Sequence, residues 1–328
     1  MALPKQLVES LRAVDGVRVW ADAPLAPFTT IGTGGKAGLL VTCTDTPAVV
    51  ATLALLEDGA EQWICLGAGS NFLVADDVYP GGVVKLGREF QYVEGLVCPA
   101  SSSEPVVVTV GAAASLPRVA AAAAEVGLAG LDFACGIPGT IGGAVAMNAG
   151  AYGHSFVEVL EEVELAAASG AAWVPAPSLD CGYRHCNLPR GSIVTAARLR
   201  LTAGAAAEVL ECHRETLRKR RVAQPQGVRT FGSTFMNPSG EGAGRLIDAA
   251  GLKGVRRGGA EISNVHANFL VNLGDATTAD VLALMDLMRG EVKRTCGVEL
   301  EPEVRLIGSC FPWESSVADS QEPPDSHG

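Results

Sequence analysis

The chain has 328 residues and a formal net charge of −11. This length exceeds one ordinary core and predicts roughly two or three domains, while the acidic balance argues against a general nucleic-acid surface. The longest apolar runs, at residues 119–124 and 141–147, are too short to cross a bilayer, and the first residues lack the pattern of a secretion signal. Nine cysteines, scattered singly, are more typical of a reducing compartment than of a disulfide framework, so we expect a cytoplasmic protein without membrane insertion.

The N-terminal part predicts a strand–helix–strand unit that ends in a glycine turn. Apolar runs at residues 39–43 and 63–66 predict two buried strands. Between them, Thr46 is expected as the N-cap of a helix that Gly59 closes. The second strand runs directly into Gly-Ala-Gly-Ser-Asn at residues 67–71. Because open α/β units bind ligands at glycine turns that follow strands, this turn is a candidate ligand site.

Glycine recurs in two further stretches. Residues 32–36 read GTGGK, and residues 135–153 read CGIPGTIGGAVAMNAGAYG without a charged residue. Glycine lets the backbone approach a ligand closely, and consecutive exposed amides form a concavity suited to a pyrophosphate. The alternative for residues 135–153 is a loop packed closely over a sheet. No stretch completes a Rossmann or Walker fingerprint, because Phe72 replaces the third glycine and Ala37 replaces the hydroxyl residue after Lys36.

The middle of the chain predicts more strands and one helix. Extended segments run over residues 83–110 with a hairpin loop at 99–105, a helix covers 116–126, and strands cover 157–167 and 193–201.

A polar island, CGYRHC at residues 181–186, lies between the last two of these strands. Cys181, His185 and Cys186 come nearest to a metal cluster in this chain, but they lack the paired spacing of a zinc site. We therefore expect no bound metal.

Beyond a domain boundary at residues 201–205 the pattern predicts a second, smaller unit. A helix starts at residue 206 and enters the basic run RKRR at 218–221, which is either a solvated face or a docking site for phosphate. There follow a GSTFMNP turn at 232–238, a helix at 244–251, a strand at 268–273, a helix capped by Thr277 and a strand at 298–307. Alternation along the last strand places Glu299, Glu301 and Glu303 on one face. Residues 309–328 are acidic and are expected to be disordered.

Several ordered motifs together resemble the UDP-N-acetylenolpyruvoylglucosamine reductase family. They are TIGTGGKA at 30–37, LGAGSNFL at 66–73, GIPGTIGGA at 136–144, MNAGAYG at 147–153, YR at 183–184, GSTFMNP at 232–238 and EPEVRLIG at 301–308. Their order and spacing cover the chain except for its two ends. No insertion lies between Tyr183 and Ile193, so the chain looks like the shorter family type, which lacks a tyrosine-bearing loop that closes over the substrate.

The resemblance implies an α+β fold that binds FAD non-covalently. Residues 1–205 would form a two-part FAD-binding domain of the vanillyl-alcohol oxidase type, divided into 1–85 and 86–205, and residues 206–308 a smaller α/β substrate domain. The implied activity is NADPH-dependent, FAD-mediated reduction of UDP-N-acetylglucosamine enolpyruvate to UDP-N-acetylmuramate in peptidoglycan synthesis. NADPH and the UDP-sugar would use one site in turn, in a monomer.

The resemblance also implies three catalytic residues. In the family reaction a hydride reaches an enol ether through the flavin, so negative charge develops on the adjacent carbon and its carboxylate. Arg184 would hold that carboxylate, because a guanidinium stays charged and offers parallel hydrogen bonds. Glu303 would stabilise or protonate the enolic carboxylate, which requires a raised pKa, and Ser233 would deliver the proton to carbon. Without the motifs, Ser233 reads as a turn residue, and Glu301 and Glu303 read as a solvated strand face.

Binding residues follow from the same motifs. FAD would bind at Gly67, Ala68, Gly69, Ser70, Asn71, Gly136, Ile137, Pro138, Gly139, Gly142, Gly143 and Asn148, with its pyrophosphate held by the loops at 67–71 and 136–143. The UDP-sugar would meet Tyr183, Arg221 and Asn237, with Arg218 and Arg220 as further cations of the basic run. Position 236 is Met where many members have lysine. The contribution of that lysine is then either absent here or supplied by another cation, such as Lys253 or Arg256.

Two rival hypotheses stay open on the sequence. One is a different enzyme of the vanillyl-alcohol oxidase fold that uses oxygen, and such enzymes often bind flavin covalently through histidine or cysteine. The other is a catalytically idle flavin- or nucleotide-binding protein, against which the intact Arg184, Ser233 and Glu303 speak. A flavin that survives denaturation favours the first, and NADPH oxidation that depends on the enolpyruvyl substrate excludes the second.

Overall fold

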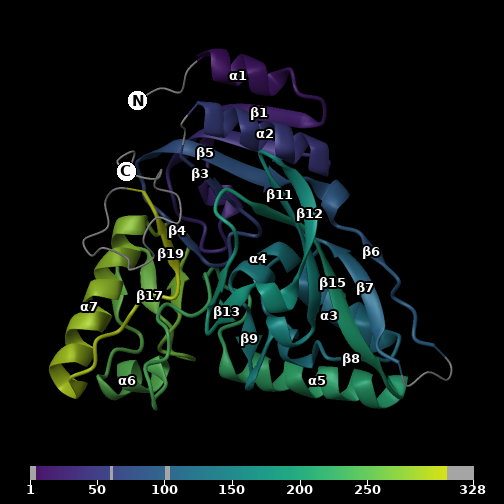
Figure 1. Cartoon of the computed structure of the whole chain (residues 1–328). Helices are drawn as coiled ribbons and strands as arrows, with labels where there is room; N and C mark the ends of the chain where they lie inside the picture. Colours follow the sequence, from purple (N-terminus) through teal and green to yellow (C-terminus); the bar gives the residue numbers. More distant parts are fainter. Residues whose placement is uncertain (1–4, 60–61, 100–103, 309–328) are drawn as a thin grey trace, which may run out of the picture.

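The computed structural model describes residues 5–59, 62–99 and 104–308. Its N-terminal unit contains α1 (Lys5–Arg12), β1 (Val17–Pro24), η1 (Ala26–Phe28), β2 (Lys36–Cys43), α2 (Thr46–Asp58), β3 (Trp63–Cys65), β4 (Phe72–Val74) and β5 (Val78–Leu86). Strands β1, β2, β5 and β3 form a sheet in that order, at the top of Figure 1, and only β1 is antiparallel to its neighbour. The predicted strand–helix–strand unit is present as β2, α2 and β3, with β5 inserted between its two strands.

Helix α2 begins with a different cap from the predicted one. Asp45, not Thr46, is the N-cap, because its carboxylate accepts a 2.8 Å hydrogen bond from the Ala48 amide. A carboxylate at this position also interacts favourably with the positive end of the helix dipole. Gly59 ends the helix as predicted.

The next part of the chain builds a larger antiparallel sheet. Its elements are η2 (Arg88–Phe90), β6 (Val93–Glu94), β7 (Val106–Gly111), α3 (Leu116–Glu125), β8 (Leu128–Ala129), η3 (Asp132–Ala134), α4 (Ile141–Ala146), β9 (Gly150–Ala151), β10 (His154–Ser155), η4 (Phe156–Glu158), β11 (Leu160–Ala167), β12 (Gly170–Pro175), η5 (Ala176–Ser178), β13 (Asp180–Gly182), β14 (His185–Asn187) and β15 (Ile193–Ala203). The strand order is β12-β11-β15-β7-β6, and β8 pairs with the end of β15. Figure 1 shows this sheet on the right, with α3 and α4 against it.

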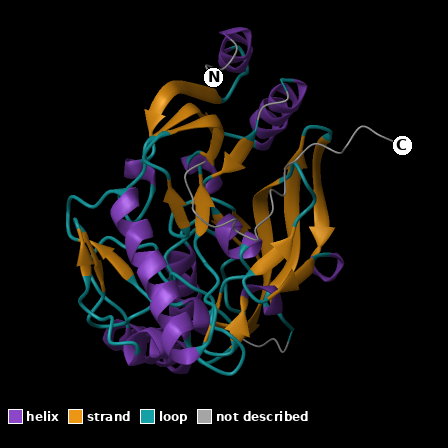
Figure 2. Cartoon of the chain, turned by 90° about the vertical axis from the view of Figure 1, so that its left-hand side faces the viewer, coloured by secondary structure: helices purple, strands orange, loops and turns teal. Residues whose placement is uncertain are grey.

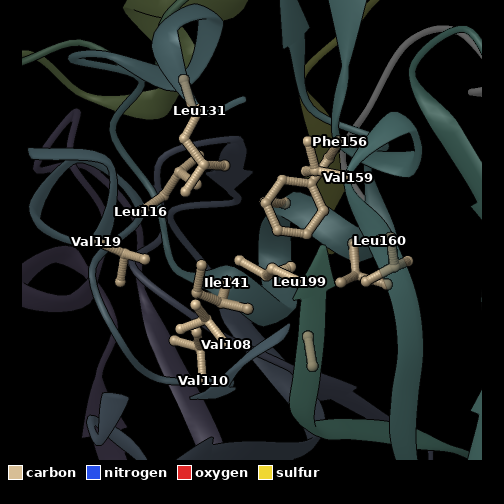
Figure 3. Packing of buried hydrophobic residues seen from close by; sticks show 14 of the residues in the cluster. Val108, Val110, Leu116, Val119, Leu131, Ile141, Phe156, Val159, Leu160 and Leu199 are labelled. Atoms are coloured by element: carbon tan, nitrogen blue, oxygen red, sulfur yellow. The ribbon is translucent and has the colours of Figure 1, made fainter. Parts of the chain in front are cut away.

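A hydrophobic core lies between this sheet and its helices. Figure 3 shows Phe156 among aliphatic side chains from α3, α4, β7, β11 and β15, including Ile141 and Leu199. Phe156 is fully buried, and alanines fill much of the remaining space in the same cluster. Small side chains therefore bring the glycine-rich segment that contains α4 close to the sheet.

Phe156→Ala is expected to lower the free energy of unfolding by about 3–5 kcal/mol, because it removes a fully buried ring and leaves a cavity. Val107→Ala, at a position on β7 that is 44% exposed, serves as the control and should cost less than about 1 kcal/mol. Denaturant titration with both variants checks this expectation. Similar losses in the two variants would contradict the assignment of Phe156 to the core.

The C-terminal part is a small sheet covered by helices. It contains α5 (Ala206–Ala223), α6 (Ala243–Ala249), β16 (Arg256–Arg257), β17 (Ala260–Ile262), β18 (Leu270–Asn272), α7 (Thr278–Cys296) and β19 (Arg305–Ile307). Strands β16, β17 and β18 form an antiparallel sheet, against which α7 packs; Figure 2 views this part of the molecule from its own side. Thr277 caps α7 as predicted, by accepting a hydrogen bond from the Asp280 amide, and Gly297 ends it in a left-handed conformation with φ 71°.

Helix α5 and strand β19 connect the two parts of the molecule. Helix α5 packs on α3 and η3 rather than on the small sheet, as its place along the bottom of Figure 1 also shows. Strand β19 pairs in parallel with β4, directly after the glycine turn at residues 67–71. The division of the chain at residue 206 stays a prediction.

The predicted strand at residues 298–307 is wrong for most of its length. Only Arg305–Ile307 forms a strand, and Pro302 makes an isolated bridge with Phe235. Proline lacks an amide donor and interrupts regular pairing. The alternation therefore breaks: Glu299 lies 3.3 Å from Lys293 at the end of α7, whereas Glu303 points to the site described below.

Two expectations fall wholly or partly outside the described residues: the hairpin loop at 99–105 in part, and the tail at 309–328 entirely. Strands β6 and β7, on either side of that loop, are antiparallel, as a hairpin requires. Among the described residues, no helix combines the length and apolarity needed to span a membrane.

Candidate active site

The predicted glycine loops lie side by side. The Ser70 hydroxyl donates a 2.8 Å hydrogen bond to the Pro138 carbonyl, and a side chain at Gly67 would meet Thr140. In the stretch TIGTGGKA at residues 30–37, the Thr30 amide donates a hydrogen bond to the Gly69 carbonyl at 3.1 Å. Three stretches far apart in the sequence therefore build one surface.

Several carbonyls of this surface accept hydrogen bonds within the protein, whereas several of its amides donate none to the described residues. Among the described residues, no backbone amide from 67 to 70 donates a hydrogen bond to another protein atom, and those of Gly136 and Gly139 are equally without an acceptor. Gly69 has φ +66°, and a Cβ there would lie 2.0 Å from the Phe28 carbonyl oxygen. Free amides on a backbone that admits no side chain fit a pyrophosphate.

Other residues predicted to bind the cofactor are already engaged within the protein. The amides of Ile137, Gly142 and Gly143 donate to Ala134, Ala112 and Thr140, and Pro138 has no amide. The Asn148 side chain donates to the Gly182 carbonyl at 2.9 Å and accepts from the Val157 amide at 3.0 Å. The cofactor roles of these residues stay predictions, and Asn148 has an evident structural role.

A tight hairpin of strands β13 and β14 presents Tyr183 and Arg184. These two residues form its turn, and Arg184 has a left-handed backbone with φ 63°, a conformation that is unfavourable for a residue other than glycine. The hairpin is anchored to the glycine-rich segment twice, through Asn148 and through a 2.8 Å hydrogen bond from Arg184 Nη1 to the Gly150 carbonyl. The exposed Tyr183 ring lies 5.1 Å from the guanidinium. These anchors fix the direction of the Arg184 side chain.

A disulfide joins Cys181 and Cys186 across this hairpin, which corrects the expectation that the cysteines are single. The two residues stand directly opposite each other in the strand pairing, with their Cα atoms 3.9 Å apart. A spacing of five residues gave no signal for such a bond, because only the two-residue turn brings the side chains together. The bond also occupies both thiols of the supposed metal cluster.

Breaking this disulfide is expected to slow the step that depends on Arg184. In the Cys181→Ser/Cys186→Ser double variant we expect flavin reoxidation by the UDP-sugar substrate to fall by roughly three- to thirtyfold, because a looser hairpin misplaces the guanidinium. Stopped-flow absorbance measures the rate, and Cys296→Ser, at an exposed free cysteine, is the control. An unchanged reoxidation rate would show that the hydrogen-bond anchors alone hold the hairpin.

Glu303 meets Arg184 in a shielded ion pair. Arg184 Nε lies 2.8 Å from Glu303 Oε1, and the two side chains are 21% and 15% exposed. Burial raises the pKa of Glu303 above its ordinary value, and the charge of Arg184 partly opposes this rise. The direction is the one that the sequence predicts for a carboxyl group that donates a proton.

The segment of Ser233 lies beside that of Glu303. The Glu303 amide donates to the Thr234 carbonyl at 2.9 Å, and the Asn71 side chain donates to the Glu303 carbonyl at 3.1 Å. Gly232, with φ 86°, turns the chain into this extended segment. The structure thus brings Arg184 and Glu303 into contact and places Ser233 on the adjoining segment.

The residues proposed for the UDP-sugar are less tightly grouped. The Asn237 side-chain carbonyl accepts a 3.0 Å hydrogen bond from the amide of Ala243, the first residue of α6. Three of the candidate cations are in ion pairs on the protein surface: Arg218 with Glu211, Lys253 with Asp248, and Arg256 with Glu261.

Arg220, rather than the exposed Arg221, lies against the glycine-rich segment. Its side-chain stem would be 3.2 Å from a Cβ at Gly136. Burial lowers the pKa of Arg220, and the nearby charge of Arg184 lowers it further. The basic run at 218–221 includes Arg220, but the sequence does not single it out from its neighbours. Which arginine meets the glycine-rich segment depends on which face of α5 packs on α3.

Family models match both parts of the chain. One for the C-terminal domain of UDP-N-acetylenolpyruvoylglucosamine reductase matches residues 224–307, and one for an FAD binding domain matches residues 37–174. Together they cover both the small sheet and the loops described above, and they confirm the predicted α+β fold with an FAD-binding part and a C-terminal domain.

Whole-chain relatives carry the same name. The UDP-N-acetylenolpyruvoylglucosamine reductase of Anaeromyxobacter dehalogenans (strain 2CP-C) is 45% identical over 91% of this chain and 88% of its own length. That of Myxococcus xanthus (strain DK1622) is 40% identical over 92% of this chain and 96% of its own length. The crystal structure of the Thermus caldophilus enzyme superposes with a TM-score of 0.75 at 36% identity, over 89% of this chain and 99% of that one. On this sequence and structural similarity, the chain belongs to the UDP-N-acetylenolpyruvoylglucosamine reductase family.

Proposed function

We propose that Arg184, Glu303 and Ser233 form the catalytic centre of this family member. Its reaction is the NADPH-dependent, FAD-mediated reduction of UDP-N-acetylglucosamine enolpyruvate to UDP-N-acetylmuramate in peptidoglycan precursor synthesis. The observation that carries the proposal is the shielded contact between Arg184 and Glu303, beside the segment that bears Ser233. An ion pair that only supported the fold would not need a strained hairpin to present it.

The glycine loops would hold FAD through its pyrophosphate. The free amides at residues 67–70 and at Gly136 and Gly139 are the donors available for it. When bound, FAD supplies hydride transfer from NADPH to the terminal carbon of the substrate's enol ether.

Arg184 would bind the substrate carboxylate and Glu303 would carry a proton beside it. A second carboxylate on the same guanidinium raises the pKa of Glu303 further, since two like charges cannot both be ionised cheaply at one cation. Protonated Glu303 can then donate a hydrogen bond to the carboxylate as negative charge develops there. Ser233 would give its hydroxyl proton to the neighbouring carbon, which is basic enough in the transition state to accept it.

Anaerobic reoxidation tests this function directly. The protein is purified with FAD, reduced with one equivalent of NADPH, and mixed with UDP-N-acetylglucosamine enolpyruvate without oxygen. We expect the absorbance of oxidised flavin to return and UDP-N-acetylmuramate to form. Reoxidation only after oxygen is admitted would favour an oxidase, and a flavin that NADPH cannot reduce would favour an idle binding protein.

We also propose that the chain acts as a monomer in the cytoplasm. All proposed site residues come from a single chain, so no second subunit is needed to complete the site. NADPH and UDP-sugars are cytoplasmic metabolites, which supports the location. Sedimentation equilibrium is expected to give a species of 33.7 kDa, and a dimer at working concentration would contradict the proposed monomer.

A further inference from the structure

A lysine side chain lies behind the glycine loop of residues 67–71. Lys85, on strand β5, donates hydrogen bonds from its ammonium to the carbonyl oxygens of Leu66 and Gly67, at 3.1 and 2.7 Å. The ring of Phe28 covers the same ammonium, with its centroid 5.3 Å from Nζ. Burial lowers the pKa of Lys85 from its ordinary value. The Lys85 ammonium is therefore directed at the backbone of the glycine loop.

The geometry of the peptide unit determines what these two bonds do. In a trans peptide the carbonyl and the following amide point in opposite directions within one plane. Bonds from Lys85 to the carbonyls of Leu66 and Gly67 therefore turn the amides of Gly67 and Ala68 away from the lysine. Those are two of the amides that have no acceptor among the described residues.

Thr30 binds the loop in a similar way two peptides further along. Its amide donates to the carbonyl of Gly69 at 3.1 Å and so turns the amide of Ser70 away from Thr30. Lys85 and Thr30 thus bind three carbonyls of the loop and turn the three amides that follow them away from these partners.

The two loops themselves supply no cation, and the nearby charges come from other elements, as Arg220 does at Gly136. Residues 66–71 and 135–148 contain no lysine or arginine. Among the described residues, no carboxylate forms an ion pair with Lys85, and a buried ammonium without such a partner is costly. The two carbonyl bonds and the Phe28 ring offset part of this cost, and an anion bound on the other side of the loop would offset more of it.

We propose that Lys85 is a positioning residue for the FAD pyrophosphate, which aims the amides of Gly67 and Ala68 at the phosphates and places a positive charge behind them. It acts through the loop and does not touch the cofactor. The inference rests on the proposed placement of the pyrophosphate at residues 67–70.

Two substitutions separate its charge from its hydrogen bonds. Lys85→Met removes both, and Lys85→Gln keeps a donor without the charge. Lys293→Met, at an exposed lysine of α7, is the matched control. For each protein, FAD is removed, the dissociation constant for added FAD is measured by quenching of flavin fluorescence, and the melting temperature of the apoprotein is recorded.

Lys85→Met is expected to raise the dissociation constant for FAD by about 10- to 100-fold, as the loss of charged hydrogen bonds implies. Lys85→Gln should give a smaller rise, and Lys293→Met none. The melting temperature of each apoprotein should stay within about 3 °C of the wild type, because the lost bonds and the relieved desolvation of the ammonium oppose each other.

Two results would overturn the inference. One is an unchanged FAD affinity in Lys85→Met. The other is a fall of more than about 10 °C in the apoprotein melting temperature of both Lys85 variants, which would make Lys85 a support of the fold. Failure of the proposed cofactor site itself would show differently, as wild-type apoprotein that binds no FAD.

Discussion

Replacing Ser233 with alanine is expected to slow reoxidation of the reduced flavin by the enolpyruvyl substrate by about 10²- to 10⁴-fold, the range for loss of a positioned proton donor. Reduction of the flavin by NADPH should stay close to normal, because no proton from Ser233 is needed in that half-reaction. Anaerobic stopped-flow absorbance at the flavin band measures the two half-reactions separately.

The contrast between the half-reactions distinguishes a chemical role of Ser233 from a structural one. Ser10→Ala is a suitable control, since Ser10 lies on helix α1, which packs on β1 and α2 in the N-terminal unit. Equal slowing of both half-reactions in Ser233→Ala would mean that the residue only supports its turn. The carbon would then have to receive its proton from another donor.

Replacing Arg184 with methionine is expected to slow reoxidation by about 10²- to 10³-fold, because the developing carboxylate charge loses its fixed cation. The same change leaves Glu303 buried without its partner. Arg198→Met removes an arginine that pairs with Glu162 on the large sheet and should leave both half-reactions unaltered. A reoxidation rate in Arg184→Met within a few-fold of the wild type would remove Arg184 from the catalytic centre.

Arg184→Met should also change the pH dependence of stability. Because burial raises the pKa of Glu303, the folded state holds this proton more tightly than the unfolded state does. The resulting stabilisation is complete below the ordinary carboxyl pKa and is lost as the pH rises through the raised value. Removing the opposing charge of Arg184 moves that loss to higher pH, and Glu303→Gln abolishes it, which denaturant titrations across pH can measure.

Local pattern was enough to predict much of the molecule. The glycine turn at residues 67–71 follows a short strand, and the helix capped by Thr277 is present where its cap and apolar spacing place it. Such features depend on neighbouring residues, so a sequence displays them directly. The family motifs extended this to Arg184 and Glu303, which are distant in sequence and yet in contact.

What the sequence did not reveal depends on tertiary placement. Glu299 and Glu303 would lie on one face of a regular strand. The strand is interrupted at the isolated bridge of Pro302, and the two side chains contact different partners. Lys85 reads as an ordinary strand residue until the carbonyls of the neighbouring loop are located. The pairing of Cys181 with Cys186 likewise exists only once the turn between them has closed.

Asn71 gives the site a property that neither half of the chain has alone. Its backbone carbonyl accepts a 2.9 Å hydrogen bond from the Arg305 amide, while its side chain holds the carbonyl of Glu303. An enzyme that exchanges two bulky ligands at one site must open without losing the alignment of its reacting groups. If the proposed roles hold, Asn71 fastens the acid Glu303 to the loop that would hold FAD, and the exchange of NADPH for the nucleotide sugar would leave Glu303 in position.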